Sequence, residues 1–434
     1  MQHTGRPLAA TAAVLCLLLF SSTPSVPAQV TLVEDGRAVA TIVVPDGATE
    51  TKGGQESPAA TARTAAEELQ KFVTRASTAE LPIVTASQAP RDGMLVLVGR
   101  SALTDQFGIV VPRQSEGVRI QTIPRGVAIV GEIAPNGTNN RPLAQDRGTL
   151  HAVYLFLERH LGFRFYFQRG RDADLGVVVP RKRTITVGPI DFTSAPAFPY
   201  RAIVPYSGSG NWKAATRAGQ ATGFSCNHTH MGWAGLYQET HPEYFSLQAN
   251  GKRDFRFLCY GNPDVLQREL DHTRTYYESG QRIGGSPNEK YIPVEPDDNW
   301  KECRCELCQA LVDPSRGRYG RHSRLWWDHY IRHLGEAVKQ HWPDKRVAAL
   351  AYQGRILPGD KDLPDNVDVQ VCIHNAPLNF YKEPSARTEI RRLLGDWSTK
   401  LGKDRSRLYV WDYTCYPQYW SCAPTLYPRT LQQF

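Results

Sequence analysis

From residue 200 onward the sequence repeats one arrangement: a short apolar segment, a loop, and a longer segment with the spacing of an amphipathic helix. Short apolar strands that alternate with helices pair in parallel, because each helix carries the chain back to the start of the next strand. In a region of about 250 residues this pattern is typical of a (β/α)8 barrel of the TIM type. The predicted strands lie at residues 200–204, 223–227, 291–294, 346–352, 368–374 and 408–413, with helices at 263–277, 325–340 and 384–401 between them.

Six strands are fewer than a complete barrel needs. Two long inserts, at residues 228–262 and 299–324, take up much of the length, and the sequence stops soon after Cys422. We therefore expect a (β/α)8 barrel that is incomplete at its C-terminal end, with about six strands.

The region before the barrel has a different organisation. Apolar segments at residues 38–44, 94–98, 117–123 and 126–131 predict strands, and residues 58–75 and 149–160 have helical spacing. A segment rich in proline, Ser194–Pro199, separates this region from the barrel. We expect a small α/β domain over residues 29–193, followed by the barrel over residues 194–434.

Residues 1–28 have the composition of a secretory signal peptide. Arg6 gives a positive start, Leu8 to Phe20 form an apolar core, and Val26-Pro27-Ala28 offers a cleavage site before Gln29. The apolar core is too short for a membrane anchor, and no later segment is long and apolar enough to cross a bilayer. We expect a secreted protein, periplasmic or extracellular. The oligomeric state does not follow from the sequence.

Composition limits the classes of protein that this chain can belong to. Hydrophobic residues make up 41% and charged residues 22%, which excludes disordered and collagen-like chains. The formal net charge of +8 is spread over 434 residues without a basic tail, so we expect no nucleic-acid partner.

The cysteines allow two interpretations. Eight remain beyond the leader, and an even number in an exported protein favours disulfides. Cys303, Cys305 and Cys308 form a dense cluster that could instead bind zinc, with Cys259 or a nearby histidine as the fourth ligand. We expect disulfides here, and neither a catalytic metal nor a cofactor.

Polar and aromatic side chains gather after the predicted strands, where barrel enzymes carry their active sites. Carboxylates protonate the leaving oxygen of a sugar and activate water or attack carbon, while aromatic faces stack on pyranose rings. The expected catalytic residues are Glu295, Asp297, Asp298 and Asp412. The expected substrate-binding residues are His228, His230, Trp300, Tyr352, His374 and Tyr413.

Each of these residues also has an ordinary structural explanation. Acidic residues after a strand are often solvated loop residues or helix caps. His228 and His230 alternate, so one of them can face a cleft while the other faces away. A zinc hydrolase that uses these two histidines is a further possibility, although no third ligand stands at suitable spacing.

Several segments resemble a known family. These are GTLHAVYLFLERHLGFRFYF at residues 148–167, HPEYFSL at 241–247 with Gly251-Lys-Arg253, the Cys303–Cys308 cluster and AALAYQ at 348–353. In order and spacing they resemble the exported bacterial proteins of domain-of-unknown-function family 4838. Members of that family resemble glycoside hydrolases, and the N-terminal domain is similar to those of family 67 α-glucuronidases and family 20 hexosaminidases.

The resemblance implies a carbohydrate substrate. We expect an exported enzyme that hydrolyses glycosidic bonds in a polysaccharide or oligosaccharide, including those of acidic or amino sugars. A non-catalytic glycan-binding or cell-surface protein on a barrel scaffold is the alternative.

Overall fold

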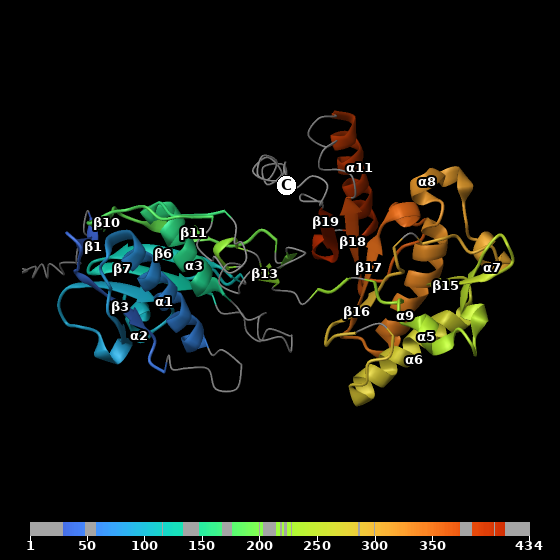
Figure 1. Cartoon of the computed structure of the whole chain (residues 1–434), viewed down its shortest axis with the longest axis horizontal. Helices are drawn as coiled ribbons and strands as arrows, with labels where there is room; N and C mark the ends of the chain where they lie inside the picture. The colour runs from blue at the N-terminus through green and yellow to red at the C-terminus, as the bar shows by residue number, and fades with distance from the viewer. Residues whose placement is uncertain are drawn as a thin grey trace, which may run out of the picture. The chain divides into compact units, whose positions relative to one another are not determined.

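The computed structural model describes residues 29–47, 58–114, 116–132, 147–166, 176–198, 200–202, 214–217, 219–220, 224–226, 228–284, 287–298, 300–373, 384–402 and 404–412. The expected leader lies outside these ranges. The described residues form two compact units, with the boundary between residues 195 and 196 (Figure 1). None of their helices is both long enough and apolar enough to traverse a bilayer.

The first unit is built on a six-stranded sheet with the order β11-β6-β7-β5-β3-β4. Its central strands are parallel, and β6 and β11 join antiparallel at one side. The strands are β3 (Ala40–Val44), β4 (Ile83–Thr85), β5 (Met94–Val98), β6 (Val118–Ile123), β7 (Gly126–Gly131) and β11 (Asp191–Ser194). Two small sheets accompany it, formed by β1 (Val30–Glu34), β2 (Arg37–Ala38) and β10 (Ile185–Val187), and by β8 (Arg164–Phe165) and β9 (Val177–Val178).

Helices α1 (Pro58–Ser77) and α3 (Gly148–Phe156) pack on this sheet and on each other. A π-helical turn, Leu157–Leu161, continues α3. Leu103, in the short helix α2 (Ala102–Gln106), and Phe107, which follows it, pack on the opposite side of the sheet. The strands and helices predicted for this region are therefore present, because their apolar residues repeat with the period of each element.

The second unit contains a parallel sheet in which β16 (Tyr291–Val294), β17 (Arg346–Ala351), β18 (Val367–Ile373) and β19 (Leu408–Asp412) follow one another in sequence order. All three pairings are parallel. Four of the six predicted barrel strands are thus confirmed in place and direction.

The expected barrel is shown only in part. The predicted strand at residues 200–204 is the two-residue strand β12 (Tyr200–Arg201), which pairs antiparallel with β13 (Gly219–Gln220). Residues 224–226, from the predicted strand 223–227, are not in a strand. This segment packs on the sheet through a side chain: the ring of Phe224 stacks on that of Tyr409, with centroids 3.7 Å apart. The described residues form a mixed α/β unit rather than a closed barrel.

Helices and a hairpin make up much of the rest of the second unit, and helix α9 (Arg332–His341) packs directly on β17 of the parallel sheet. The hairpin consists of β14 (Phe245–Leu247) and β15 (Arg253–Leu258). The helices are α5 (Trp233–Tyr237), α6 (Pro263–Ser279), α7 (Glu306–Gln309), α8 (Gly317–Gly320), α9 (Arg332–His341) and α11 (Pro384–Lys400). A π-helical segment, Arg324–Ile331, leads directly into α9. Single 3₁₀ turns lie at Ala86–Gln88, Pro242–Tyr244, Pro314–Arg316, Gln353–Arg355 and Arg405–Arg407.

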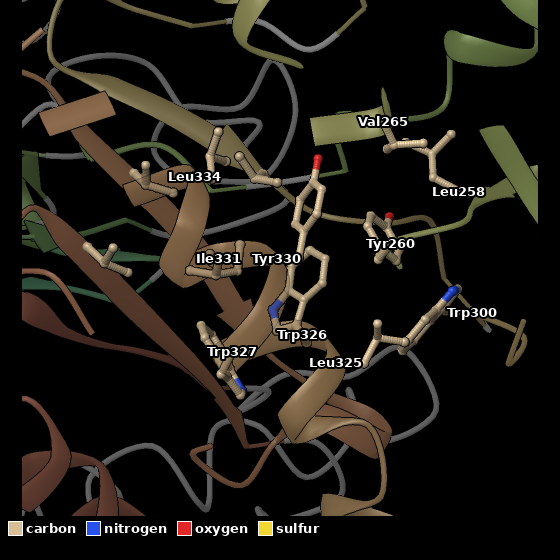
Figure 2. Packing of buried hydrophobic residues seen from close by; sticks show 14 of the residues in the cluster. Leu258, Tyr260, Val265, Trp300, Leu325, Trp326, Trp327, Tyr330, Ile331 and Leu334 are labelled. Carbon is tan, nitrogen blue, oxygen red and sulfur yellow. The ribbon is translucent and has the colours of Figure 1, made fainter. Parts of the chain in front are cut away.

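The two faces of the sheet have different partners. Val347, Val367 and Val369 face a large aromatic core that is filled by the helix pair 324–341. Figure 2 shows the rings of this core, with Trp326, Trp327 and Tyr330 on one helix and Tyr260 and Trp300 arriving from loops. The other face carries Tyr291, Leu350, Cys372 and Tyr409, packed against Phe224 and Cys226. Burial of both faces explains why most residues of these strands are apolar, although β18 also carries the buried Asp368 and Gln370.

Gly131, at the end of β7, provides a test of the first unit. A Cβ atom there would lie 1.8 Å from the carbonyl carbon of Gly148, so the start of α3 would have to move. We expect Gly131→Ala to lower the free energy of unfolding by about 1–3 kcal/mol, measured by urea denaturation. The matched control is Gly188→Ala, because Gly188 is exposed and nothing lies within 4 Å of its added Cβ. Equal stability of the two variants would contradict this packing.

Candidate functional site

Glu295 directly follows strand β16, at the carboxyl end of the parallel sheet. Its side chain is completely buried, and one carboxylate oxygen accepts a hydrogen bond from the backbone N–H of Leu350 at 3.3 Å. Its backbone exchanges two hydrogen bonds with Thr229: the Thr229 N–H donates to the Glu295 carbonyl, and the Glu295 N–H donates to Thr229 Oγ1, at 3.0 and 3.1 Å. Glu295 is therefore held to Thr229 through its backbone and to strand β17 through its carboxylate.

The partner of Glu295 is Arg355, which is also buried and forms a direct ion pair with it. The guanidinium of Arg355 also lies over the rings of Trp300 and Trp326, at 5.4 and 5.1 Å from their centroids. Such stacking suits the flat, delocalised charge of arginine. Among the described residues, Nε and Nη1 of Arg355 have no hydrogen-bond partner, so the cation has unused donors at this site.

A strained turn after β17 aims Arg355 at Glu295. Gln353 has φ +52°, in the left-handed region that residues other than glycine rarely occupy. Two indole N–H groups hold the turn in place: Trp327 donates to the carbonyl of Arg355 at 2.8 Å, and Trp397 donates to that of Ile356 at 2.7 Å. The aromatic core thus positions the cation.

Burial dominates the electrostatics of Glu295. Loss of hydration raises the pKa of its carboxyl group to about 7, and Arg355 and His228 only partly oppose this rise. A carboxyl group with such a pKa is protonated in a large fraction of the molecules near neutral pH, as a general acid requires.

His228 and Asp298 meet at the rim of this site. The Nδ1 atom of His228 lies 2.6 Å from the carbonyl oxygen of Pro296, and its Nε2 lies 3.6 Å from Asp298 Oδ1. Asp298 is exposed, and its own N–H donates to the carboxylate of Asp297 at 2.8 Å. The structure thus brings together Glu295, His228, Asp297 and Asp298, four of the residues that the sequence singles out.

His230 and Trp300 are placed differently from the sequence-based expectation. His230 is buried, with Nδ1 2.9 Å from the hydroxyl of Tyr260 and Nε2 3.2 Å from Glu269 on α6. Trp300 is nearly covered, because its ring packs against Tyr260 and Arg355. Neither side chain offers an open surface to a sugar, since each is committed to the core.

The remaining predicted residues are only partly described. Tyr352 is half-buried just after the end of β17, and it packs on the sheet face that carries Tyr291, Leu350 and Tyr409. Asp412 is the last residue of β19, and its side chain lies outside the description. His374 and Tyr413 lie outside the described residues.

The zinc hydrolase alternative does not fit these positions. His230 uses its two nitrogens on Tyr260 and Glu269, while His228 faces Pro296 and Asp298, so the two rings share no ligand position. In the described part of the chain, the side chains that could hold a metal are four cysteines: Cys259, Cys303, Cys305 and Cys308. None of the six described cysteines forms a disulfide, in contrast to the disulfides that we expected.

A family model described as a domain of unknown function, DUF4838, matches residues 173–433. The chain belongs to the DUF4838 family. This confirms the family that the sequence segments suggested. No curated protein matches the sequence.

Solved structures that are similar to this DUF4838 chain are reported at low identity. A β-N-acetylhexosaminidase from Bacteroides fragilis is 12% identical, with a TM-score of 0.37 over 86% of this chain and 70% of the other. An N-acetyl-β-hexosaminidase from Streptomyces plicatus is 11% identical, with a TM-score of 0.38 over 84% and 69%. A family GH20 exo-β-N-acetylglucosaminidase from Vibrio harveyi is 12% identical, with a TM-score of 0.34 over 82% and 57%.

Sequence reasoning missed Arg355 and Thr229 in this DUF4838 site. Arg355 lies 60 residues from Glu295, in a turn without a recognisable motif. One signal was available, because a carboxylate predicted to follow a buried strand needs a cation, and Arg355 comes four residues after β17 ends.

The ion pair can be tested through stability. Arg355→Met leaves the Glu295 carboxylate buried without its cation, so we expect a loss of about 3–5 kcal/mol at a pH above 7. The loss should shrink as the pH falls toward 7 and then level off, because without Arg355 the pKa of Glu295 lies above its wild-type value of about 7, so the variant binds a proton at a higher pH than the wild type does. Urea denaturation at several pH values measures both quantities.

The double variant Glu295→Gln/Arg355→Met is the control for this prediction. It removes both charges, so it should be more stable than Arg355→Met alone at a pH above 7. A pH-independent loss in the single variant, with no recovery in the double variant, would show that the two side chains are not electrostatically coupled.

Proposed function

We propose that this DUF4838 protein is an exported glycoside hydrolase that cleaves polysaccharides or oligosaccharides, with Glu295 as the general acid. The observation that carries the proposal is the buried Glu295 carboxyl group, with a pKa of about 7, at the carboxyl end of parallel strand β16. Cleavage of a glycosidic bond requires a proton on the leaving oxygen, and a carboxyl group with a raised pKa can supply it.

The strand order supports the other roles that we propose. β16 and β19 run parallel in one sheet, so Glu295 and Asp412 both come at the carboxyl ends of strands. We assign Asp412 as the base or nucleophile that acts with Glu295. His228, Asp298 and Tyr352 are assigned to sugar binding at the rim, and the predicted leader would direct export.

Acidic sugars are favoured by the charge near the sheet edge. A hollow beside the end of β18 is lined by Arg318 and Arg392, with Glu389 as the acidic residue among its described lining; a third arginine of the lining, Arg316, is paired with Asp360. Arginine binds carboxylates and sulfates through paired hydrogen bonds. Uronate or sulfated glycans are therefore the first substrates to examine.

Removal of the acid should abolish most of the activity. We expect Glu295→Gln to lower kcat/KM by about 100- to 10,000-fold on natural glycans, because glutamine cannot donate the proton. The loss should be smaller on aryl glycosides with good leaving groups, since such groups need little protonation. Steady-state kinetics on both substrate types, after a screen of glycans and aryl glycosides, measures the difference.

Asp368→Asn is the matched control. Asp368 is a buried carboxylate paired with Arg346 on the same sheet, but at the amino end of strand β18. Its loss should lower stability and leave kcat/KM on natural glycans nearly unchanged. Wild-type activity in Glu295→Gln would remove Glu295 from the mechanism.

The pH profile of the wild type provides a separate test. The acid must be protonated, so kcat/KM should fall as the pH rises through about 7, the pKa of Glu295. The measurement is kcat/KM between pH 4 and 10 on one aryl glycoside with a poor leaving group. A profile that stays flat through pH 7 would exclude Glu295 as the acid.

The second candidate is a glycan-binding protein without catalysis. The observation in its favour is that Glu295 is already saturated by Arg355 and Leu350 within the core, as a structural carboxylate would be. This candidate predicts saturable binding to a glycan in calorimetry, with no product formed after long incubation. Turnover that depends on Glu295 would exclude it.

A further inference from the structure

Four cysteines from two separate segments converge in the second unit. Cys259 follows strand β15, while Cys303, Cys305 and Cys308 lie in and before the short helix α7. Their sulfur atoms all lie within 4.8 Å of one another. Cys259, Cys303 and Cys308 are buried, and Cys305 is half-buried.

The distances between the sulfur atoms suit a shared metal ion. Cys259 Sγ lies 3.4 Å from that of Cys305, 3.6 Å from that of Cys308 and 3.7 Å from that of Cys303. Four thiolates around zinc, each at about 2.3 Å, stand about 3.8 Å apart at the corners of a tetrahedron. A disulfide needs about 2.05 Å, and none of these pairs is that close.

We propose that Cys259, Cys303, Cys305 and Cys308 bind one structural zinc ion. Tetrahedral sites with four sulfur ligands are typical of zinc, and four protein ligands leave no position for a reacting water. The ion would therefore stabilise the fold and take no part in catalysis. This inference does not depend on the proposed glycosidase activity.

The surroundings of the sulfur atoms fit thiolates. The backbone N–H of Leu247 points at Cys303 Sγ at 3.2 Å, and that of Gly261 points at Cys308 Sγ at 3.3 Å. Such donors stabilise negative charge on sulfur and orient metal ligands. Gly261 has no room for a side chain, because a Cβ would lie 3.0 Å from Cys308 Sγ. The backbone is thus packed closely around the cluster.

The local structure needs such a cross-link. Helix α7 has only four residues, and a helix of one turn is not stable without tertiary support. The segment before it carries Asp297, Asp298 and Trp300, and it meets the core beside Tyr260, the neighbour of Cys259. A zinc ion at the cysteines would fix this loop to the end of β15, and thereby hold the rim of the candidate site.

Metal analysis of the full chain tests the proposal. The protein, purified without reductant or chelator, should contain one zinc ion per chain by inductively coupled plasma mass spectrometry. After chelation, denaturation and alkylation, peptide mass spectrometry should find all four cysteines alkylated, which shows that they were free thiols and not disulfides. Disulfide-linked peptides among the four, an absence of metal, or iron in place of zinc would each overturn the assignment.

Cys305→Ser is the most informative variant. Cys305 occupies the N-cap position of α7 and its side chain makes no capping hydrogen bond, so serine, which is favourable at an N-cap, removes a sulfur ligand without weakening the start of the helix. We expect this variant to lose zinc to a chelator about 10- to 100-fold faster than the wild type does. Cys226→Ala is the control, because Cys226 is a buried free cysteine outside the cluster, and it should retain the ion. Equal zinc retention by both variants would overturn the ligand set, and should Cys305→Ser fail to fold, the metal content of the wild type still decides.

Discussion

The parallel sheet β16–β19 must be covered on both faces, and most of the second unit follows from that requirement. Its backbone is paired within the sheet, but its valines, alanines and leucines are removed from water only if other elements pack above and below. The helix pair 324–341 supplies one cover, with Trp326 and Trp327 filling the core. Phe224 and Cys226 contribute to the other without forming a strand. Charged side chains of this sheet lie near the ends of its strands, and the buried Gln370 is a neutral polar residue in the middle of β18.

Each end of this sheet carries an ion pair, and the two pairs differ in their exposure to water. At the amino end, Asp368 binds Arg346, whose side chain is 25% exposed, and accepts a hydrogen bond from the hydroxyl of Tyr291. At the carboxyl end, Glu295 binds Arg355, whose side chain is only 1% exposed. The cation of the pair is therefore partly open to water at one end, while at the other end strong desolvation raises the pKa of Glu295. Desolvation, and not the choice of residue types, distinguishes the candidate site.

The long inserts of the second unit also have an identifiable structural role. The hairpin β14–β15 and the loop before α7 bring the four cysteines together, and Tyr260 links this cluster to the aromatic core through Trp326 and Tyr330. Asp297 and Asp298 of the rim come in the sequence between the end of β16 and Cys303. Packed rings thus connect this loop with Arg355, because Trp300 contacts both Tyr260 and the guanidinium of Arg355.

The sequence by itself determined many of the local elements: strands β3, β5, β6 and β7 of the first unit, the four parallel strands of the second, the main helices, the family, and the acidic residues that follow β16. These features depend on periods of two and 3.6 residues and on short motifs, which are contained in neighbouring residues. The tertiary structure alone decided that Arg355 meets Glu295 across 60 residues, that Cys259 joins the later cysteines, and that His230 and Trp300 turn into the core. It also decided that the segment expected at 223–227 contributes side chains rather than a described strand. Such contacts depend on which elements become neighbours during packing, and no local pattern in the chain specifies that.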